Sequence, residues 1–203
     1  MALPGKAAMR SRLKQTLGSL DSARKSELSA RIRVRLECLE FVRAAAWVLC
    51  YAPLFDEPDI WPWVEQRLAV RGRVALLRFE AALGEYVPVE IEGRDGELSP
   101  GRFGVREPAA SCLVVPWNRL DLVLVPGLAF DSSGGRLGRG RGFYDRVLTR
   151  AATTACGVAF EEQLFPEVPL EAHDVRLDCL VTPERFLSFS SSGGRTGRFA
   201  QGV

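Results

Sequence analysis

The sequence lacks the features of a membrane-spanning, secreted or zinc-binding protein. No run of about 18 uncharged apolar residues is present, and the beginning of the chain has no apolar signal core. The five cysteines are scattered, odd in number and without a Cys-x-x-Cys spacing, so we expect neither a disulfide framework nor a zinc site. We therefore expect buried free thiols, no membrane association and a cytoplasmic location.

Histidine is nearly absent, because His173 is the only one, and no Ser or Cys motif beside it indicates a catalytic triad. We interpret the His173-Asp174 pair as part of a structural loop. The net charge of +2 argues against a nucleic-acid-binding protein. Residues 1–45 nevertheless hold ten Lys and Arg against four Asp and Glu, which indicates either a solvated helical face or attraction of an anionic ligand.

The chain does contain enough apolar material for one compact domain. It has 203 residues, of which 47% are hydrophobic and 26% are charged, and this length suits a single core. We predict one domain over residues 1–187. Residues 188–203 are rich in Ser, Gly and Arg and have little to bury, so we predict that they form a mobile tail.

Periodic apolar residues predict the helices near the start of the chain. Met9, Leu13 and Leu17 recur every four residues, as on one face of a helix. Asp21 is placed to cap a second helix that ends near Leu39. A third helix is expected over about residues 60–70, with Asp59 as its cap and Pro62 in its first turn.

Apolar runs of strand length lie at residues 46–51, 74–77, 120–125, 156–160 and 177–181. Residues 80–108 alternate apolar and polar around glycines, which predicts a hairpin or an extended excursion. Strands that alternate with helices favour a parallel sheet. The sequence therefore predicts a single-domain α/β fold, a Rossmann-like variant with a mostly parallel central sheet flanked by helices and with basic amino-terminal helices.

A glycine-rich loop follows the strand at 120–125. Gly138, Gly140 and Gly142 stand at alternate positions before a helix expected at 146–150. Glycines let backbone N–H groups approach a ligand, and a helix start adds unpaired donors, so the pattern suits phosphate. Positive charge is added by Arg136, Arg139 and Arg141. The spacing is neither the Walker A pattern nor the dinucleotide fingerprint, and a flexible turn stays open as an alternative.

The segment VPGLAFDSSGGRLGRGRGFYDRVL resembles the signature of the 5-formyltetrahydrofolate cyclo-ligase family. Further segments similar to that family extend the resemblance over roughly residues 6–186: Lys6-x-x-x-Arg10, 51–57, Arg106-Glu107-Pro108, 157–163, 173–178 and 181–184. Two features depart from the family pattern. Residues 78–103 show no obvious counterpart for one wall of the folate pocket, and Phe143 stands where tyrosine is common.

The resemblance implies conversion of 5-formyltetrahydrofolate and ATP into 5,10-methenyltetrahydrofolate, ADP and phosphate, with ATP as co-substrate and Mg²⁺ as cofactor. Phosphoryl transfer to the formyl oxygen needs positioned ligands and charge stabilisation and no covalent enzyme intermediate. The absence of a triad fits this chemistry. The partners implied are a reduced folate and ATP, with neither nucleic acid nor membrane, and we expect a monomer.

The resemblance also assigns roles to individual residues. Those implied in nucleotide binding are Lys6, Arg10, Arg136, Leu137, Gly138, Arg139, Gly140, Arg141, Gly142, Phe143 and Tyr144. Those implied in folate binding are Ala52, Glu57, Arg139, Gly140, Arg141, Gly142 and Phe143. The residues expected to be catalytic are Arg139 and Arg141, and those expected to hold magnesium are Asp145 and Asp178.

Ordinary structural roles stay open for the three acids among these residues. Asp145 is also a favourable first-turn helix residue, Asp178 a strand-edge charge and Glu57 a loop acid. Two alternatives stay open for the whole chain. One is a family paralogue with another substrate or a regulatory role. The other is a nucleic-acid-binding module that uses the basic amino-terminal helices.

Overall fold

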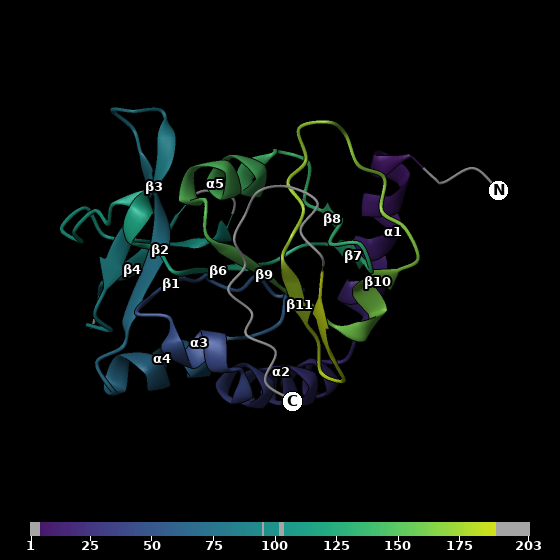
Figure 1. Ribbon diagram of the computed structural model, residues 1–203, viewed down its shortest axis with the longest axis horizontal. Helices are drawn as coiled ribbons and strands as arrows, with labels where there is room; N and C mark the ends of the chain where they lie inside the picture. Colours follow the sequence, from purple (N-terminus) through teal and green to yellow (C-terminus); the bar gives the residue numbers. More distant parts are fainter. Residues whose placement is uncertain (1–4, 95, 102–103, 190–203) are drawn as a thin grey trace.

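A computed structural model describes residues 5–94, 96–101 and 104–189 of the chain (Figure 1). Most of the predicted tail at 188–203 lies outside the described residues. The described fold extends past residue 187, because Ser188 closes the last strand and Phe189 donates its N–H to the carbonyl oxygen of Asp178 over 2.9 Å.

The centre of the fold is a seven-stranded sheet in the order β12-β11-β9-β6-β1-β2-β3. Its members are β1 Trp47–Leu49, β2 Arg73–Glu80, β3 Glu85–Ile91, β6 Leu122–Val125, β9 Thr154–Val158, β11 Cys179–Val181 and β12 Phe186–Ser188. Neighbouring strands from β11 to β2 run parallel, whereas β12 and β3 are antiparallel at the two edges. The predicted mostly parallel α/β fold is confirmed.

Two small sheets accompany the central one. The first contains β10 Leu164–Phe165, β7 Ala129–Asp131 and β8 Arg136–Leu137, and the second pairs β4 Leu98–Pro100 with β5 Arg106–Pro108. The β2–β3 and β4–β5 hairpins account for the extended excursion predicted over residues 80–108.

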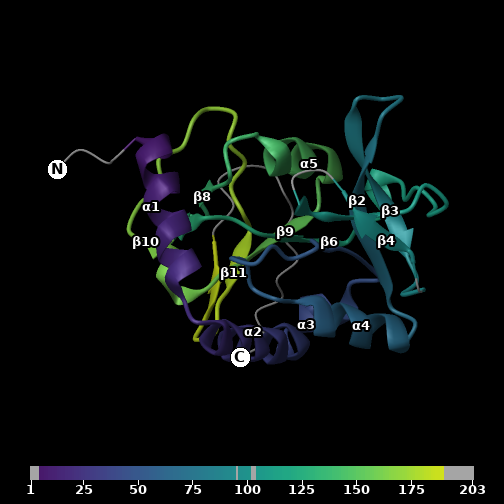
Figure 2. The same cartoon turned by 180° about the vertical axis from the view of Figure 1, so that it is seen from behind.

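Helices cover both faces of the central sheet. The helical elements are α1 Lys6–Ser19, α2 Ser22–Cys38, α3 Glu40–Ala44, α4 Trp61–Ala69, α5 Phe143–Ala151 and the short 3-10 helices η2 Trp117–Arg119 and η3 Glu161–Gln163. Helices α2, α3 and α4 lie on one side and α5 on the other, while α1 stands at the end beside β7, β8 and β10 (Figures 1 and 2). No described helix is long and apolar enough to cross a membrane.

Side-chain alternation along the strands divides the core in two. Val48 packs in the cluster beneath α2 and α4, and its neighbour Leu49 packs in the cluster beneath α5. Strands buried on both faces read as unbroken apolar runs, which is why periodicity located them well. The stripe of Met9, Leu13 and Leu17 is buried as predicted.

The capping prediction for Asp21 is confirmed, since its side chain accepts the N–H of Arg24 at 3.2 Å. Asp59 accepts the N–H of Trp61 at 2.9 Å, although the residue that caps α4 by backbone conformation is Ile60. One boundary was wrong. Helix α5 begins at Phe143 and not at 146, because Gly142 adopts a left-handed conformation, with φ of 57°, and starts the helix directly after the loop.

The five cysteines are all free thiols, as predicted. The expected burial holds for Cys50, Cys156 and Cys179, but it was wrong for Cys38, which is exposed at the end of α2, and for Cys112, which is half-buried.

Candidate active site

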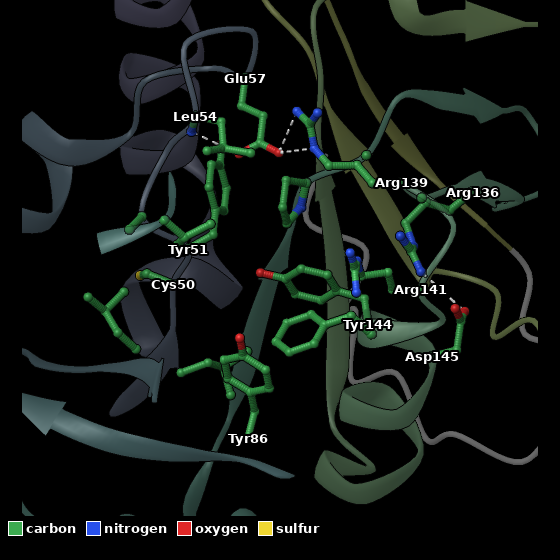
Figure 3. Close-up of a pocket in the computed structure, with 18 of the residues that line it drawn as sticks. Cys50, Tyr51, Leu54, Glu57, Tyr86, Arg136, Arg139, Arg141, Tyr144 and Asp145 are labelled. Atoms are coloured by element: carbon green, nitrogen blue, oxygen red, sulfur yellow. Dashed lines mark hydrogen bonds and ion pairs between the residues drawn. The ribbon is translucent and has the colours of Figure 1, made fainter. Parts of the chain in front are cut away.

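A cavity of about 460 Å³ opens at the carboxyl ends of β1 and β6. This edge is where ligands gather in open parallel sheets, because the loops that leave the strands splay apart there. The segment that follows β1 supplies Cys50, Tyr51, Ala52, Leu54 and Glu57. The segment that follows β6 supplies residues 126–127, 136, 138–139 and 141–145. Figure 3 shows these side chains facing one another across the cavity.

The glycine loop lies between β8 and α5 and forms one wall. Gly140 and Gly142 both have positive φ, 100° and 57°, which glycine adopts without strain. The Nε of Arg10 donates to the carbonyl oxygen of Gly138 at 2.9 Å. A Cβ atom on Gly140 would lie 3.3 Å from the Cζ of Arg10. The backbone of this loop is therefore packed against an arginine of α1.

The amino terminus of α5 points its unpaired backbone N–H groups and the positive end of its dipole towards this loop. Arg136 supplies a second charge there. Its side chain is 4% exposed and its Nη2 lies 3.1 Å from the Oδ1 of Asp145. Its buried Nε has no hydrogen-bond acceptor among the residues that the structure describes. This concentration of donors fits an oxyanion such as a phosphate.

Arg139 crosses the cavity wall to two acidic residues in the loop after β1. Its Nη2 lies 2.5 Å from the Oδ1 of Asp56 and 3.1 Å from the Oε1 of Glu57, and its Nε donates to the same Glu57 oxygen at 3.2 Å. Burial raises the pKa of Glu57, and the charge of Arg139 opposes that rise. The predicted folate residue Glu57 and the predicted phosphate residue Arg139 are thus in direct contact.

Aromatic rings from the start of α5 and from β3 line another part of the cavity. Phe143 meets Tyr86 edge-on, with ring centroids 4.5 Å apart, and meets Tyr144 at 5.2 Å. Such a wall suits a planar, partly apolar ligand. Phe55 does not contribute to it, since its ring is 77% exposed and lies near Lys25 instead.

Two of the residues predicted to bind nucleotide have side chains directed elsewhere. The Nζ of Lys6 lies 2.6 Å from the Oδ2 of Asp174 and 3.0 Å from the Oε1 of Glu171, and Lys6 is not among the cavity-lining residues that the structure describes. The side chain of Leu137 is buried in the core, so this residue could contact a nucleotide only through its backbone. His173 is 68% exposed on the loop that carries Asp174, which agrees with a structural loop.

The two aspartates predicted to share magnesium lie in different places. Asp145 lines the cavity, where its Oδ1 accepts the N–H of Val175 at 3.2 Å and pairs with Arg136. Asp178 precedes β11, and its Oδ2 accepts the N–H of Ala155 at the amino-terminal end of β9. Across residues 5–94, 96–101 and 104–189 there is no group of three or more His, Cys, Asp or Glu side chains placed to hold a metal.

Asp145 contacts Val175, and the neighbouring Asp174 is paired with Lys6. No contact between Asp145 and Asp178 is among those that join the described residues. The shared site stays a prediction.

Several lining residues were not predicted from the sequence. They are Lys14, Cys50, Tyr51, Leu54, Leu76, Leu77, Tyr86, Val105, Arg106, Glu107, Pro126 and Gly127. Glu107 is the most notable, since its buried carboxylate accepts the N–H of Phe79 at 3.0 Å and the hydroxyl of Tyr86 at 3.4 Å. The resemblance of the Arg106-Glu107-Pro108 segment to the family could have indicated Glu107, but the strand pairing that brings this segment to the cavity could not be predicted from the sequence.

A parallel α/β sheet with a glycine-arginine loop and an aromatic wall at its carboxyl edge defines a protein class that binds anionic small molecules. The comparisons with known proteins make this more specific. The model of the 5-formyltetrahydrofolate cyclo-ligase family matches residues 2–183, so the chain belongs to that family. The resemblance found in the sequence is confirmed.

Some related proteins match over nearly their whole lengths. The chain is 35% identical over 196 residues to the 5-formyltetrahydrofolate cyclo-ligase of Mycolicibacterium smegmatis, which covers 91% of this chain and 97% of the relative. It is 30% identical over 178 residues to that of Escherichia coli (strain K12), covering 85% and 97%. The solved structure of Aquifex aeolicus 5,10-methenyltetrahydrofolate synthetase superposes with a TM-score of 0.83 at 27% identity, covering 97% of this chain and 99% of the other.

Proposed function

We propose that this protein is an ATP-dependent 5-formyltetrahydrofolate cyclo-ligase, which forms 5,10-methenyltetrahydrofolate, ADP and phosphate. One observation carries the proposal beyond family membership. A single cavity joins an oxyanion-binding loop to a buried carboxylate, Glu57, and an aromatic wall. Phosphoryl transfer between two bound ligands requires this kind of shared cavity, because both reacting groups must be held together.

The formyl group of the substrate is an amide-like carbonyl and therefore a poor electrophile. Transfer of the γ-phosphoryl group from ATP to the formyl oxygen makes that oxygen a leaving group. N10 then attacks the formyl carbon and gives up its proton, and the carbon–oxygen bond breaks as phosphate departs. No nucleophile from the protein takes part, so catalysis rests on positioning and charge.

The phosphate end of ATP is assigned to the glycine loop. Gly138, Gly142 and the first turn of α5 line the cavity, Arg136 lines it too, and Arg10 is bound to the carbonyl oxygen of Gly138. The backbone amides of Gly138, Gly140 and Gly142 are proposed to donate to the phosphates. Arg141, on the exposed rim, is proposed to neutralise charge as phosphate transfers. Lys6 is proposed to contribute only if it leaves Asp174, and Leu137 only through its backbone.

The folate is assigned to the other half of the cavity. An ionised Glu57 can accept two N–H groups from the pterin ring, while Phe143 packs against the ring and Ala52 lies at its edge. Arg139 adjoins both ligands. Magnesium, when bound, would neutralise phosphate charge, and Asp145 is the residue placed to hold it. We further propose a cytoplasmic monomer that acts on small molecules, without nucleic-acid or membrane partners.

The direct test is to incubate the purified protein with 5-formyltetrahydrofolate, Mg²⁺ and ATP, and to follow the methenyl absorbance band together with ADP release. Equal amounts of methenyl product and ADP are expected. Folded protein that binds ATP but forms no methenyl product would instead identify a paralogue with another substrate. Binding to heparin that survives moderate salt would favour the nucleic-acid alternative.

A further inference from the structure

Asp56 is a buried acid that neither the family resemblance nor the cavity lining singles out. It lies in the loop between β1 and α4, directly before Glu57, and its side chain is only 2% exposed. The side chain of Glu57 is 6% exposed. Both carboxylates meet the same partner, the guanidinium of Arg139, whose Nη2 contacts an oxygen of each. Figure 3 shows the guanidinium turned towards Glu57.

The backbone around Arg139 does little to direct its side chain. The residue stands between two glycines, and Gly140 has a φ of 100°. Its direction is therefore fixed mainly by its ion pairs. Glu57 receives both Nε and Nη2, at 3.2 and 3.1 Å, and Asp56 receives Nη2 at 2.5 Å. Three contacts to two residues restrain a planar guanidinium more tightly than the two contacts to Glu57 alone.

We infer that Asp56 is a positioning residue, which holds Arg139 against Glu57 so that Glu57 remains an ionised acceptor for the folate ring. The inference rests on the proposed function. Asp56 is not one of the described residues that line the cavity, so it acts on the ligand through Arg139. It adds to the site a residue to which no role has been given.

Asp56 can change the pKa of Glu57 in two opposite directions, directly through its own charge and indirectly through the position of Arg139. The negative charge of Asp56 raises the pKa of Glu57 directly, whereas the charge of Arg139 lowers it. The other titratable groups near Glu57 are Tyr51 and Tyr144, whose pKa values burial raises, so both are neutral at physiological pH. Leu54 donates its N–H to the second carboxylate oxygen at 3.0 Å.

The test compares Asp56→Asn with Asp59→Asn. Asp59 belongs to the same loop, is exposed and accepts the N–H of Trp61, a role that the side-chain oxygen of Asn also fills, so it is a matched control for lost charge. We expect Asp56→Asn to weaken binding of 5-formyltetrahydrofolate by roughly tenfold and binding of ATP by less than about twofold, measured by calorimetry. The Asp59 variant should match the wild type. Equal folate affinities in all three proteins would overturn the inference.

A merely structural role is separated by the pH profile and by a double-mutant cycle. Folate affinity should fall at acid pH as Glu57 becomes protonated. If Asp56→Asn releases Arg139, the pKa of Glu57 rises and this fall moves to higher pH. If the variant only removes the charge of Asp56, the pKa of Glu57 falls and the loss of affinity moves to lower pH. In an Arg139→Gln background, Asp56→Asn should change folate affinity little, because its effect passes through the arginine. Additive effects, or an acid limb shifted to lower pH, would refute the positioning role.

If Asp56→Asn does not fold, Arg139→Lys provides the test with Asp56 intact. Lysine keeps the charge but has no planar fork to span both acids, so we expect folate affinity to fall by a larger factor than ATP affinity. Loss of ATP affinity alone would overturn the inference. Absence of methenyl product with the wild type would defeat the proposed function and, with it, this inference. Methenyl product from the wild type together with an unchanged folate affinity in Asp56→Asn would defeat the positioning role alone.

Discussion

Arg10 of α1 donates its Nε hydrogen to the carbonyl oxygen of Gly138, and this bond of 2.9 Å joins the amino-terminal helix to the glycine loop. One of the basic residues in the positively charged segment 1–45 therefore contacts the glycine loop. Arg10 is thus held against the loop, and Lys14 of the same helix lines the cavity. A solvated helical face and attraction of an anionic ligand both stay open as explanations of the remaining basic residues.

The first prediction concerns the space beside that bond. Gly140→Val should abolish ATP binding, because the new side chain meets Arg10 at 3.3 Å or less and the φ of 100° is strained for valine. Calorimetric titration with ATP measures the loss. Gly84→Val is the matched control, since Gly84 also has positive φ, 66°, but open space around its Cβ. ATP affinity lost equally in both variants would attribute the effect to general strain.

A second prediction separates catalysis from stability at the cavity rim. Arg141 is exposed, so Arg141→Ala should leave the melting temperature nearly unchanged, as exposed charges contribute about 1 kcal/mol or less. Turnover should fall at least about tenfold, or about 1.4 kcal/mol in the transition state. Arg24→Ala, an exposed arginine on α2, is the control. A large melting shift with normal turnover would make Arg141 a structural residue.

Arg139→Ala should behave differently, because it leaves two buried carboxylates without their guanidinium. We expect a loss of about 3 kcal/mol at neutral pH in urea unfolding. Burial already raises the folded-state pKa of Glu57 above its unfolded value, and the variant should raise it further. Such a group stabilises the fold below the unfolded pKa and loses that contribution as pH rises through the folded pKa.

The variant should therefore come closest to wild-type stability near pH 4 to 5 and fall behind as pH rises towards 7. Urea midpoints measured across this range provide the check. A stability difference that is constant with pH, or that grows towards acid, would contradict the assignment of the loss to unpaired Asp56 and Glu57.

Magnesium dependence tests the predicted pair of aspartates. Asp145→Asn should raise the magnesium concentration needed for half-maximal turnover, since this carboxylate lines the cavity. Asp178→Ala should mainly destabilise the fold by about 1–3 kcal/mol, because it removes the acceptor of the buried Ala155 N–H. The same measurement on Asp174→Asn tests whether the carboxylate beside Val175 also affects the magnesium concentration needed for half-maximal turnover. Non-additive losses of magnesium affinity in Asp145→Asn and Asp178→Asn would instead place both acids on one ion.

The sequence predicted the parts of this fold that depend on local periodicity. Strands such as β6 are buried on both faces, so their apolar runs are conspicuous. Strand β12 was missed because Phe186 and Leu187 stand at the edge of a Ser-rich segment. The start of α5 was misplaced because a loop glycine, Gly142, serves as its cap.

The site was predicted where its residues follow one another in the chain, as at Gly138 to Asp145. Contacts between distant segments were not readable, and they decide how residues act. Nothing local in the sequence shows that Arg139 pairs with Asp56, 83 positions away, or that Lys6 pairs with Asp174. Side-chain direction depends on packing that forms only when the whole sheet is assembled.

The cavity draws on residues from Lys14 to Asp145, and its two principal strands, β1 and β6, are neighbours in space but far apart in the chain. It therefore exists only in the folded molecule. A ligand that binds there should protect the entire domain from unfolding by mass action, by about 2.7 kcal/mol at a concentration of about 100 times its Kd. Ligand binding in the cavity and resistance of the protein to heat or proteolysis are thus thermodynamically linked.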